Sequence, residues 1–144
     1  MGSVLLASEG RPFSAAAIAE AAALARQAGG TVHVFSVARV WGTSLGFPSP
    51  GLLPSKREWD VQRRQVAAGV AALEAAGVAA DGRVVGTRHP TRRILGEAAR
   101  LSCTAIVMGA DPPPRWGLAT FSWAAEPHRV RRRARIPVYL VAPE

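Results

Sequence analysis

The sequence has a single cysteine and no long apolar run, and each shortage excludes a class of protein. Cys103 is the single cysteine in 144 residues, so neither an intramolecular disulfide nor a cysteine-cluster metal site can form. No uninterrupted apolar stretch approaches the roughly 18 residues that a membrane span needs. The first residues place no basic region before an apolar run, which argues against a secretory signal. We therefore expect a cytoplasmic protein without a metal site.

Lysine is also nearly absent, although the chain is strongly basic. Lys56 is the one lysine among 18 basic residues, and the formal net charge is +8. A basic surface favours phosphates, nucleic acid or acidic partners. The abundance of Ala, Gly, Arg and Pro is typical of GC-rich codon usage, which is a competing explanation for arginine over lysine. It does not explain the net charge.

Short apolar runs alternate with helical patterns along the whole chain. Runs that are continuously apolar or rich in β-branched residues are typical of strands in a parallel sheet. The expected strands cover residues 4–7, 31–37, 82–87, 104–108 and 136–142. Three helices are expected to begin at caps on Ser14, Ser55 and Thr91. A last helix is expected over residues 127–135. This alternation predicts an α/β fold, a doubly wound five-stranded parallel sheet with helices on both faces, in a single domain over residues 1–144.

A long segment rich in Gly, Pro and Ser occupies residues 38–55. Segments of this length inside a compact domain are usually functional or mobile. Trp41, Phe47 and several leucines argue against plain disorder. Two interpretations remain open, a flap that contacts a protein partner and simple packing over the sheet.

Four segments, in this order and spacing, resemble the universal stress protein family. They are VLLASEGRPFS from Val4, the helix entry from Pro90 to Leu95, AIVMGA from Ala105 and ARIPVYLV at the end. The resemblance covers nearly the whole chain. It implies a sheet of strand order 3-2-1-4-5 and a homodimer joined along strand five. The short apolar strand at residues 138–142 independently favours self-association, because an unpaired strand edge is a template for pairing.

Many members of this family bind ATP, and the resemblance indicates where their motif has changed here. The family pattern after strand four is Gly, two residues, Gly, nine residues, then Gly-Ser or Gly-Thr. Gly109 matches the first position and Pro112 stands at the second. Ala124 and Ala125 take the place of Gly-Ser, and Glu9 stands where the family has Asp.

These changes remove the groups that hold phosphate. A phosphate cradle uses converging backbone N–H groups, and the three prolines of residues 112–114 have none. We therefore expect no cofactor, with ATP as the alternative ligand because arginine can bind phosphate in a fork. The vestigial nucleotide pocket that the resemblance implies would be lined by Glu9, Gly10, Val37, Met108, Gly109, Arg115, Ala124 and Ala125.

The sequence does not predict catalysis. Glu9 and Asp111 are the two acids near the expected strand ends, but no set of nucleophile, base and orienting group accompanies them, so we interpret them as turn and loop residues. There is no Walker A loop, dinucleotide fingerprint or G-x-S-x-G motif. His33 is interpreted as a strand residue with a local partner. We expect no catalytic residue and no enzyme.

Three functions follow from these observations. The first is a dimeric binding or scaffold protein with a degenerate pocket. The second is a nucleotide or anion sensor that uses Arg115 and Glu9. The third is nucleic-acid binding through the basic cluster Arg129–Arg135, which Arg92 and Arg93 would enlarge. A solvated helix face is the competing interpretation of that cluster, and the lack of aromatic residues among its arginines argues against nucleic acid.

Overall fold

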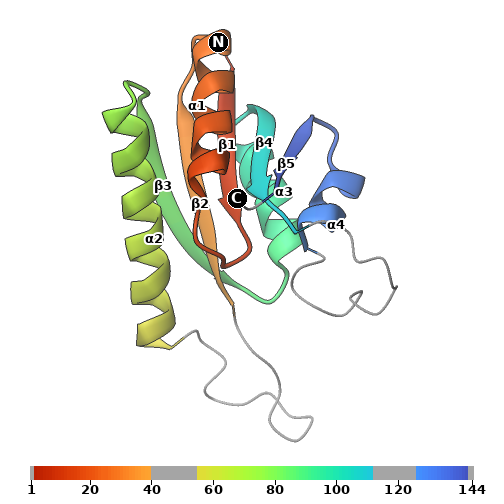
Figure 1. The fold of residues 1–144 in the computed structure, drawn as a ribbon. Coiled ribbons are helices and arrows are strands. Elements are labelled where there is room, and N and C mark those ends of the chain that lie inside the picture. The colour runs from red at the N-terminus through yellow and green to blue at the C-terminus, as the bar shows by residue number, and fades with distance from the viewer. Residues whose placement is uncertain (1, 40–54, 112–125, 143–144) are drawn as a thin grey trace, which may run out of the picture.

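The computed structural model describes residues 2–39, 55–111 and 126–142, and the structure is described for those residues alone. Within them, strands and helices alternate as the sequence predicts (Figure 1). The strands are β1 (Ser3–Ser8), β2 (Val32–Arg39), β3 (Ala80–Thr87), β4 (Cys103–Gly109) and β5 (Val138–Val141). The helices are α1 (Ala15–Ala28), α2 (Lys56–Ala75), α3 (Pro90–Arg100) and α4 (Glu126–Arg133).

All strand pairs are parallel, and the order is β3-β2-β1-β4-β5, which confirms the predicted fold class. The chain winds outward from β1 in one direction and from β4 in the other. In sheets of this kind ligands bind at such a reversal, outside the carboxyl ends of the strands. The place to look for a site is therefore the crevice between the ends of β1 and β4.

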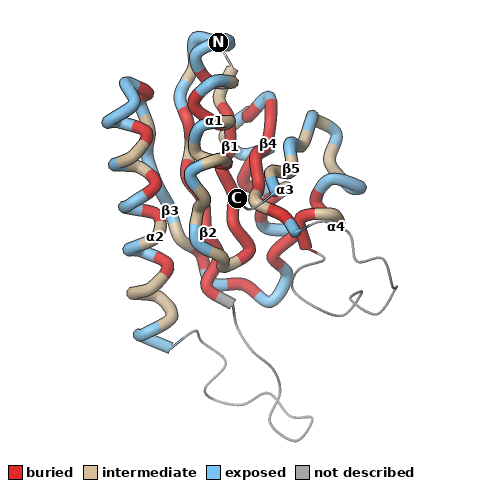
Figure 2. The backbone as a smooth tube through the Cα atoms, in the orientation of Figure 1, coloured by how far each residue is buried: buried red, intermediate tan, exposed pale blue. Residues whose placement is uncertain are grey.

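The core consists of two apolar layers, one on each face of the sheet. On one face, Val4 and Leu6 pack with buried alanines of α1 and with Leu73 of α2. On the other face, Leu5 packs with Ile94 of α3 and with residues of β2 and β4. Figure 2 shows the central strands buried along most of their length. Burial on both faces explains why the sequence of β1 is continuously apolar rather than alternating.

Local signals at the helix ends are confirmed. The Ser14 hydroxyl accepts a hydrogen bond from the amide of Ala17 at 3.1 Å, which caps α1. The Ser55 hydroxyl accepts one from the amide of Glu58 at 3.1 Å, which caps α2. Gly29 ends α1 in the left-handed conformation, with φ of 65°, where a residue with a Cβ would be strained.

Several boundaries differ from the sequence predictions: β2 ends two residues later and β5 begins two residues later than expected, and α3, α4 and β3 also differ. Thr91 does not cap α3, which begins at Pro90 after a His89 cap without a side-chain hydrogen bond, because the Thr91 hydroxyl donates to Glu126 instead. Helix α4 covers Glu126–Arg133 rather than 127–135, and the amide of Ala134, which donates to the carbonyl of Val130, closes its last turn. Strand β3 begins at Ala80, two residues early, because its first residues pair with β2.

Two further predictions from the sequence concern the segment at 38–55 and membrane spans. Residues 40–54, most of the expected flap at 38–55, lie outside the described residues, so the flap stays a prediction. None of the helices in the described part of the chain has the length and apolar character needed to cross a bilayer.

Candidate functional site

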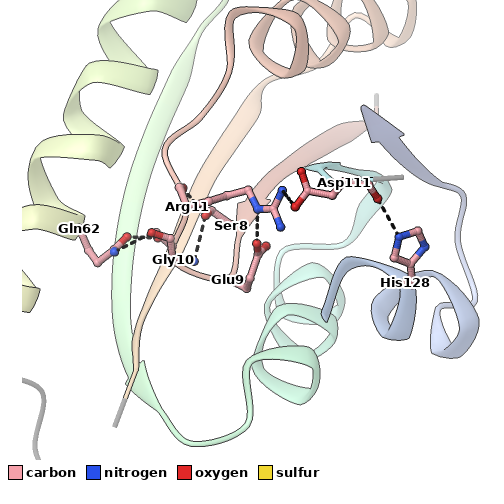
Figure 3. A network of polar contacts seen from close by, with 8 residues as sticks. Ser8, Glu9, Gly10, Arg11, Gln62, Asp111 and His128 are labelled. Carbon is pink, nitrogen blue, oxygen red and sulfur yellow. Dashed lines mark hydrogen bonds and ion pairs between the residues drawn. The ribbon is translucent and has the colours of Figure 1, made fainter. Parts of the chain in front are cut away.

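An ion network occupies the crevice between the ends of β1 and β4 (Figure 3). Glu9 follows β1 directly, and its side chain is 0 % exposed. The Arg11 Nε group donates a hydrogen bond to the carboxylate of Glu9. The same guanidinium lies 3.7 Å from the carboxylate of Asp111, just beyond β4. Arg11 therefore joins the ends of β1 and β4 by binding one carboxylate at each strand end.

The turn after β1 directs Arg11 into this position. The amide of Gly10 donates to the hydroxyl of Ser8 at 3.0 Å, and that hydroxyl donates to the carbonyl of Arg11. Gly10 has φ of 132°, a conformation that residues with a Cβ rarely adopt. The sequence Ser-Glu-Gly-Arg thus folds the chain back over the strand ends.

Gly109, the last residue of β4, lies beneath the Arg11 side chain. A Cβ placed on Gly109 would be 3.6 Å from Cδ of Arg11. In the motif that the resemblance implies, a glycine at this position would let the backbone approach a phosphate. Here the space above it is occupied by the apolar stem of an arginine.

The structure places the other predicted pocket residues as follows. Val37 and Met108 are both fully buried in the core layer that faces α3 and α4. Gly10 and Gly109 lie at the strand ends with Glu9. Three predicted residues lie outside the described residues: Arg115, Ala124 and Ala125.

Sequence reasoning missed Gln62, which fixes the turn to α2. Its amide nitrogen donates to the carbonyl of Gly10 at 3.0 Å, and its amide oxygen accepts a hydrogen bond from the hydroxyl of Ser36. Gln62 is buried. Gln62 lies three residues after Trp59 and four before Val66, a spacing that puts all three on one face of a helix. This spacing was the signal that a buried polar contact would form there.

The role of His128 and Asp111 also depends on the tertiary structure. Nε2 of His128 in α4 lies 3.1 Å from the backbone oxygen of Asp111. Glu9 and Asp111 do lie in a turn and after a strand, as predicted, but both also bind Arg11. The sequence did not indicate this shared partner.

Helix α4 carries its own carboxylate at its N-terminus. Glu126, the first residue of α4, is buried and accepts hydrogen bonds from the Thr91 hydroxyl and, at 2.9 Å, from Nη1 of Arg129. The N-terminus of a helix attracts negative charge because its free N–H groups and dipole point there. The glutamate supplies that charge from within the chain.

The described residues offer little for catalysis or metal binding. No group of three or more metal-ligating side chains occurs in the part of the chain that the structure describes. Burial raises the pKa of the Cys103 thiol to about 11, so it is not a thiolate nucleophile at neutral pH. His33 has the expected local partner, since its Nδ1 lies 2.7 Å from a carboxylate oxygen of Asp81 on the adjacent strand.

The fold and the crevice define a class, the doubly wound α/β proteins whose ligand crevice lies where the winding reverses. The model of the Universal stress protein family matches residues 1–142. The chain therefore belongs to the universal stress protein family. Among curated proteins, no sequence matched the chain significantly.

Solved structures of this family share the fold. A universal stress protein from Archaeoglobus fulgidus is 18% identical, with a TM-score of 0.73, over 98% of this chain and 93% of that one. A structure from the same organism in complex with dAMP is 17% identical, with a TM-score of 0.72, over 98% of both chains. A family protein from Burkholderia pseudomallei is 24% identical, with a TM-score of 0.69, over 97% of this chain and 95% of that one.

Proposed function

We propose that this chain is a non-catalytic binding or scaffold protein that does not hold ATP in the crevice between β1 and β4. The observation that carries the proposal is the position of Arg11, which lies over Gly109 and binds Glu9 and Asp111. Where a phosphate would approach the end of β4, the chain places one of its own side chains.

The energy of that arrangement opposes an incoming phosphate. Taking Arg11 away from the buried Glu9 carboxylate breaks a buried ion pair, which costs about 3–5 kcal/mol. Micromolar binding supplies about 8.2 kcal/mol in total, so displacement would consume roughly half of it. If Arg11 stayed, the phosphate would meet the negative charge of Glu9 beside it.

Two other features act in the same direction. The carboxylate of Glu126 already lies in the first turn of α4, so the chain itself supplies the negative charge that this helix end attracts. The prolines of residues 112–114, which lie outside the described residues, provide no N–H groups.

The alternative is a nucleotide or anion sensor with a remodelled pocket. It is favoured by the dAMP complex of a protein with the same fold and by the positive charge of Arg11 in the crevice. ATP and dAMP are therefore the two ligands to test.

The test combines calorimetric titration with nuclear magnetic resonance. We expect no shifts of the amide signals of Gly10 and Gly109 when ATP or dAMP is added, so that any saturable binding in the calorimeter takes place away from the ends of β1 and β4. Micromolar affinity together with shifts of those two amides would place the nucleotide in the crevice and overturn the proposal. The Archaeoglobus fulgidus protein crystallised with dAMP serves as the positive control.

We also infer that the scaffold is a homodimer joined through residues 138–142. The amides of Ile106 and Ala110 donate to the carbonyls of Pro137 and Val141, so the backbone carbonyls of these two residues face β4. Backbone groups of neighbouring residues in a strand point to opposite sides, which leaves those of Val138 and Leu140 at the open edge. Tyr139, 39 % exposed on this edge strand, supports an apolar contact.

A further inference from the structure

A second hollow lies between the start of α3 and helix α4, and we propose that it binds a small molecule carrying two or more phosphate groups. The cavity measures about 420 Å³. Four arginines and two buried polar residues line it: Arg88, Arg92, Arg129, Arg133, Thr91 and Glu126. This inference is independent of the proposed function, because it concerns a different cavity.

The cavity has an excess of positive charge. Glu126 is the one acidic residue among the described residues that line it, and Arg129 already forms an ion pair with it at 2.9 Å. Among the described residues, no carboxylate lies within ion-pairing distance of Arg88, Arg92 or Arg133. Three arginines therefore line one hollow without a counter-ion from the part of the chain that the structure describes.

The walls of the cavity are held in place by a buried contact. The hydroxyl of Thr91, in the first turn of α3, donates to the carboxylate of Glu126, in the first turn of α4. This bond fixes the two helix starts relative to each other. Arg129 and Arg133 are four residues apart and so lie on the same face of α4. Of the two arginines that the sequence offered as an extension of this basic cluster, Arg92 lines the same cavity and Arg93 is not among its lining residues.

The chemistry of the lining fits a compact polyphosphate. Guanidinium groups bind phosphate oxygens in a two-pronged geometry, and several of them around one cavity suit several linked phosphates. The volume lies within the roughly 300–1,000 Å³ of small-molecule sites. Among the described residues that line the cavity there is no Trp, Tyr or Phe on which a base could stack. These features favour a small phosphorylated ligand over a nucleic acid.

The test is calorimetric titration with inorganic pyrophosphate at constant ionic strength. We expect a single site in the unaltered protein, and affinity at least about tenfold lower in Arg92→Gln and in Arg133→Gln, since each removes a charge-assisted hydrogen bond. The matched control is Arg64→Gln, which removes one charge from an exposed arginine of α2 on the other face of the sheet. Its affinity should stay within about twofold of the unaltered protein. Thermal melting checks that every variant is folded.

Three outcomes would overturn the inference. The first is the absence of saturable pyrophosphate binding. The second is a loss of pyrophosphate affinity in Arg64→Gln equal to that in Arg92→Gln and Arg133→Gln, which would indicate a response to net charge alone. The third is a single-stranded oligonucleotide that binds more tightly than pyrophosphate and that Arg64→Gln also weakens. Comparison with ADP identifies the source of the phosphates. Equal affinities for pyrophosphate and ADP would indicate that the diphosphate group is recognised. A tighter complex with ADP would indicate that the ligand is a nucleotide. Both results support the site.

This experiment is separable from the test of the crevice. Pyrophosphate has no base or sugar, so its binding leaves the proposal about Arg11 and Gly109 untouched. ATP bound in the crevice would keep its affinity in Arg92→Gln. ATP held here by its phosphates would lose affinity in step with pyrophosphate, without shifts of the Gly109 amide.

Discussion

Replacing Arg11 with methionine should destabilise the protein more than replacing Glu9 with glutamine, although both changes remove the same ion pair. Arg11→Met leaves behind a carboxylate that is 0 % exposed, and loss of one partner from a buried pair costs about 3–5 kcal/mol. Glu9→Gln leaves an arginine side chain that is 14 % exposed and whose guanidinium still lies 3.7 Å from the carboxylate of Asp111. Because water and Asp111 still stabilise that charge, we expect a smaller loss of about 1–3 kcal/mol.

The assay is urea unfolding at neutral pH, followed by circular dichroism, for the two variants and their combination. The free energy of unfolding of a domain is about 5–15 kcal/mol, so both losses are measurable. The double variant should lose less than the sum of the single losses, with a coupling energy of about 0.5–3 kcal/mol. Arg64→Gln, at an exposed position of α2, should stay within about 0.5 kcal/mol of the unaltered protein.

Two results would refute this reasoning. Equal losses in the two single variants would contradict the difference in burial between Glu9 and Arg11. Strictly additive losses would show that the two side chains do not stabilise each other, and the crevice between β1 and β4 would then not be closed by an ion pair. The same variants in the ATP titration link stability to binding: if Arg11→Met gains ATP affinity, the arginine obstructs the site directly.

Three further predictions concern other parts of the molecule. Hydrogen bonding from Arg100 holds the pKa of Glu97 below its ordinary value of 4.5, although burial acts to raise this pKa. The Glu97 carboxylate therefore stabilises the fold above about pH 4.5, and this contribution is lost as the pH falls through the lower pKa of the folded state. Glu97→Gln should flatten the dependence of urea midpoints on pH in that acidic range, and an unchanged dependence would contradict the prediction. Cys103, buried and with a pKa raised to about 11, should react with a thiol reagent in urea but not in the native protein at about pH 8; rapid native labelling would disprove its burial. Tyr139→Lys places a charge at the open edge of β5 and should convert the proposed dimer to a monomer by light scattering, whereas an unchanged mass would rule out this edge as the interface.

Local sequence signals were sufficient for the fold. The continuous apolar run of β1 and the caps at Ser14 and Ser55 report on neighbouring residues alone, so each is readable from a short window. The errors fall where a distant partner intervenes. Thr91 has the chemistry of a helix cap, but its hydroxyl bonds Glu126, which lies 35 residues away. Ala80 has little preference for strands, but it pairs with Val32 of β2.

The candidate site could be predicted only in part. The resemblance of the sequence to a known family located the strand ends and identified Glu9 and Gly109 as positions of interest. It could not show that Arg11 lies between them, because a side chain that joins the ends of two strands depends on distances in space. Gln62, which fixes the same turn from α2, was missed for that reason.

The sequence by itself determined the class of fold and the order of its elements, because periodicity, turn residues and motif positions are properties of short stretches of chain. The loss of phosphate-binding residues stays a prediction from the same motif positions. The tertiary structure alone decided which charges meet. Glu9 and Asp111 come to share one arginine, and Arg92 comes to line the same hollow as Arg129 and Arg133. Electrostatic contacts act over a few ångströms, and the fold sets those distances between residues that are far apart along the chain.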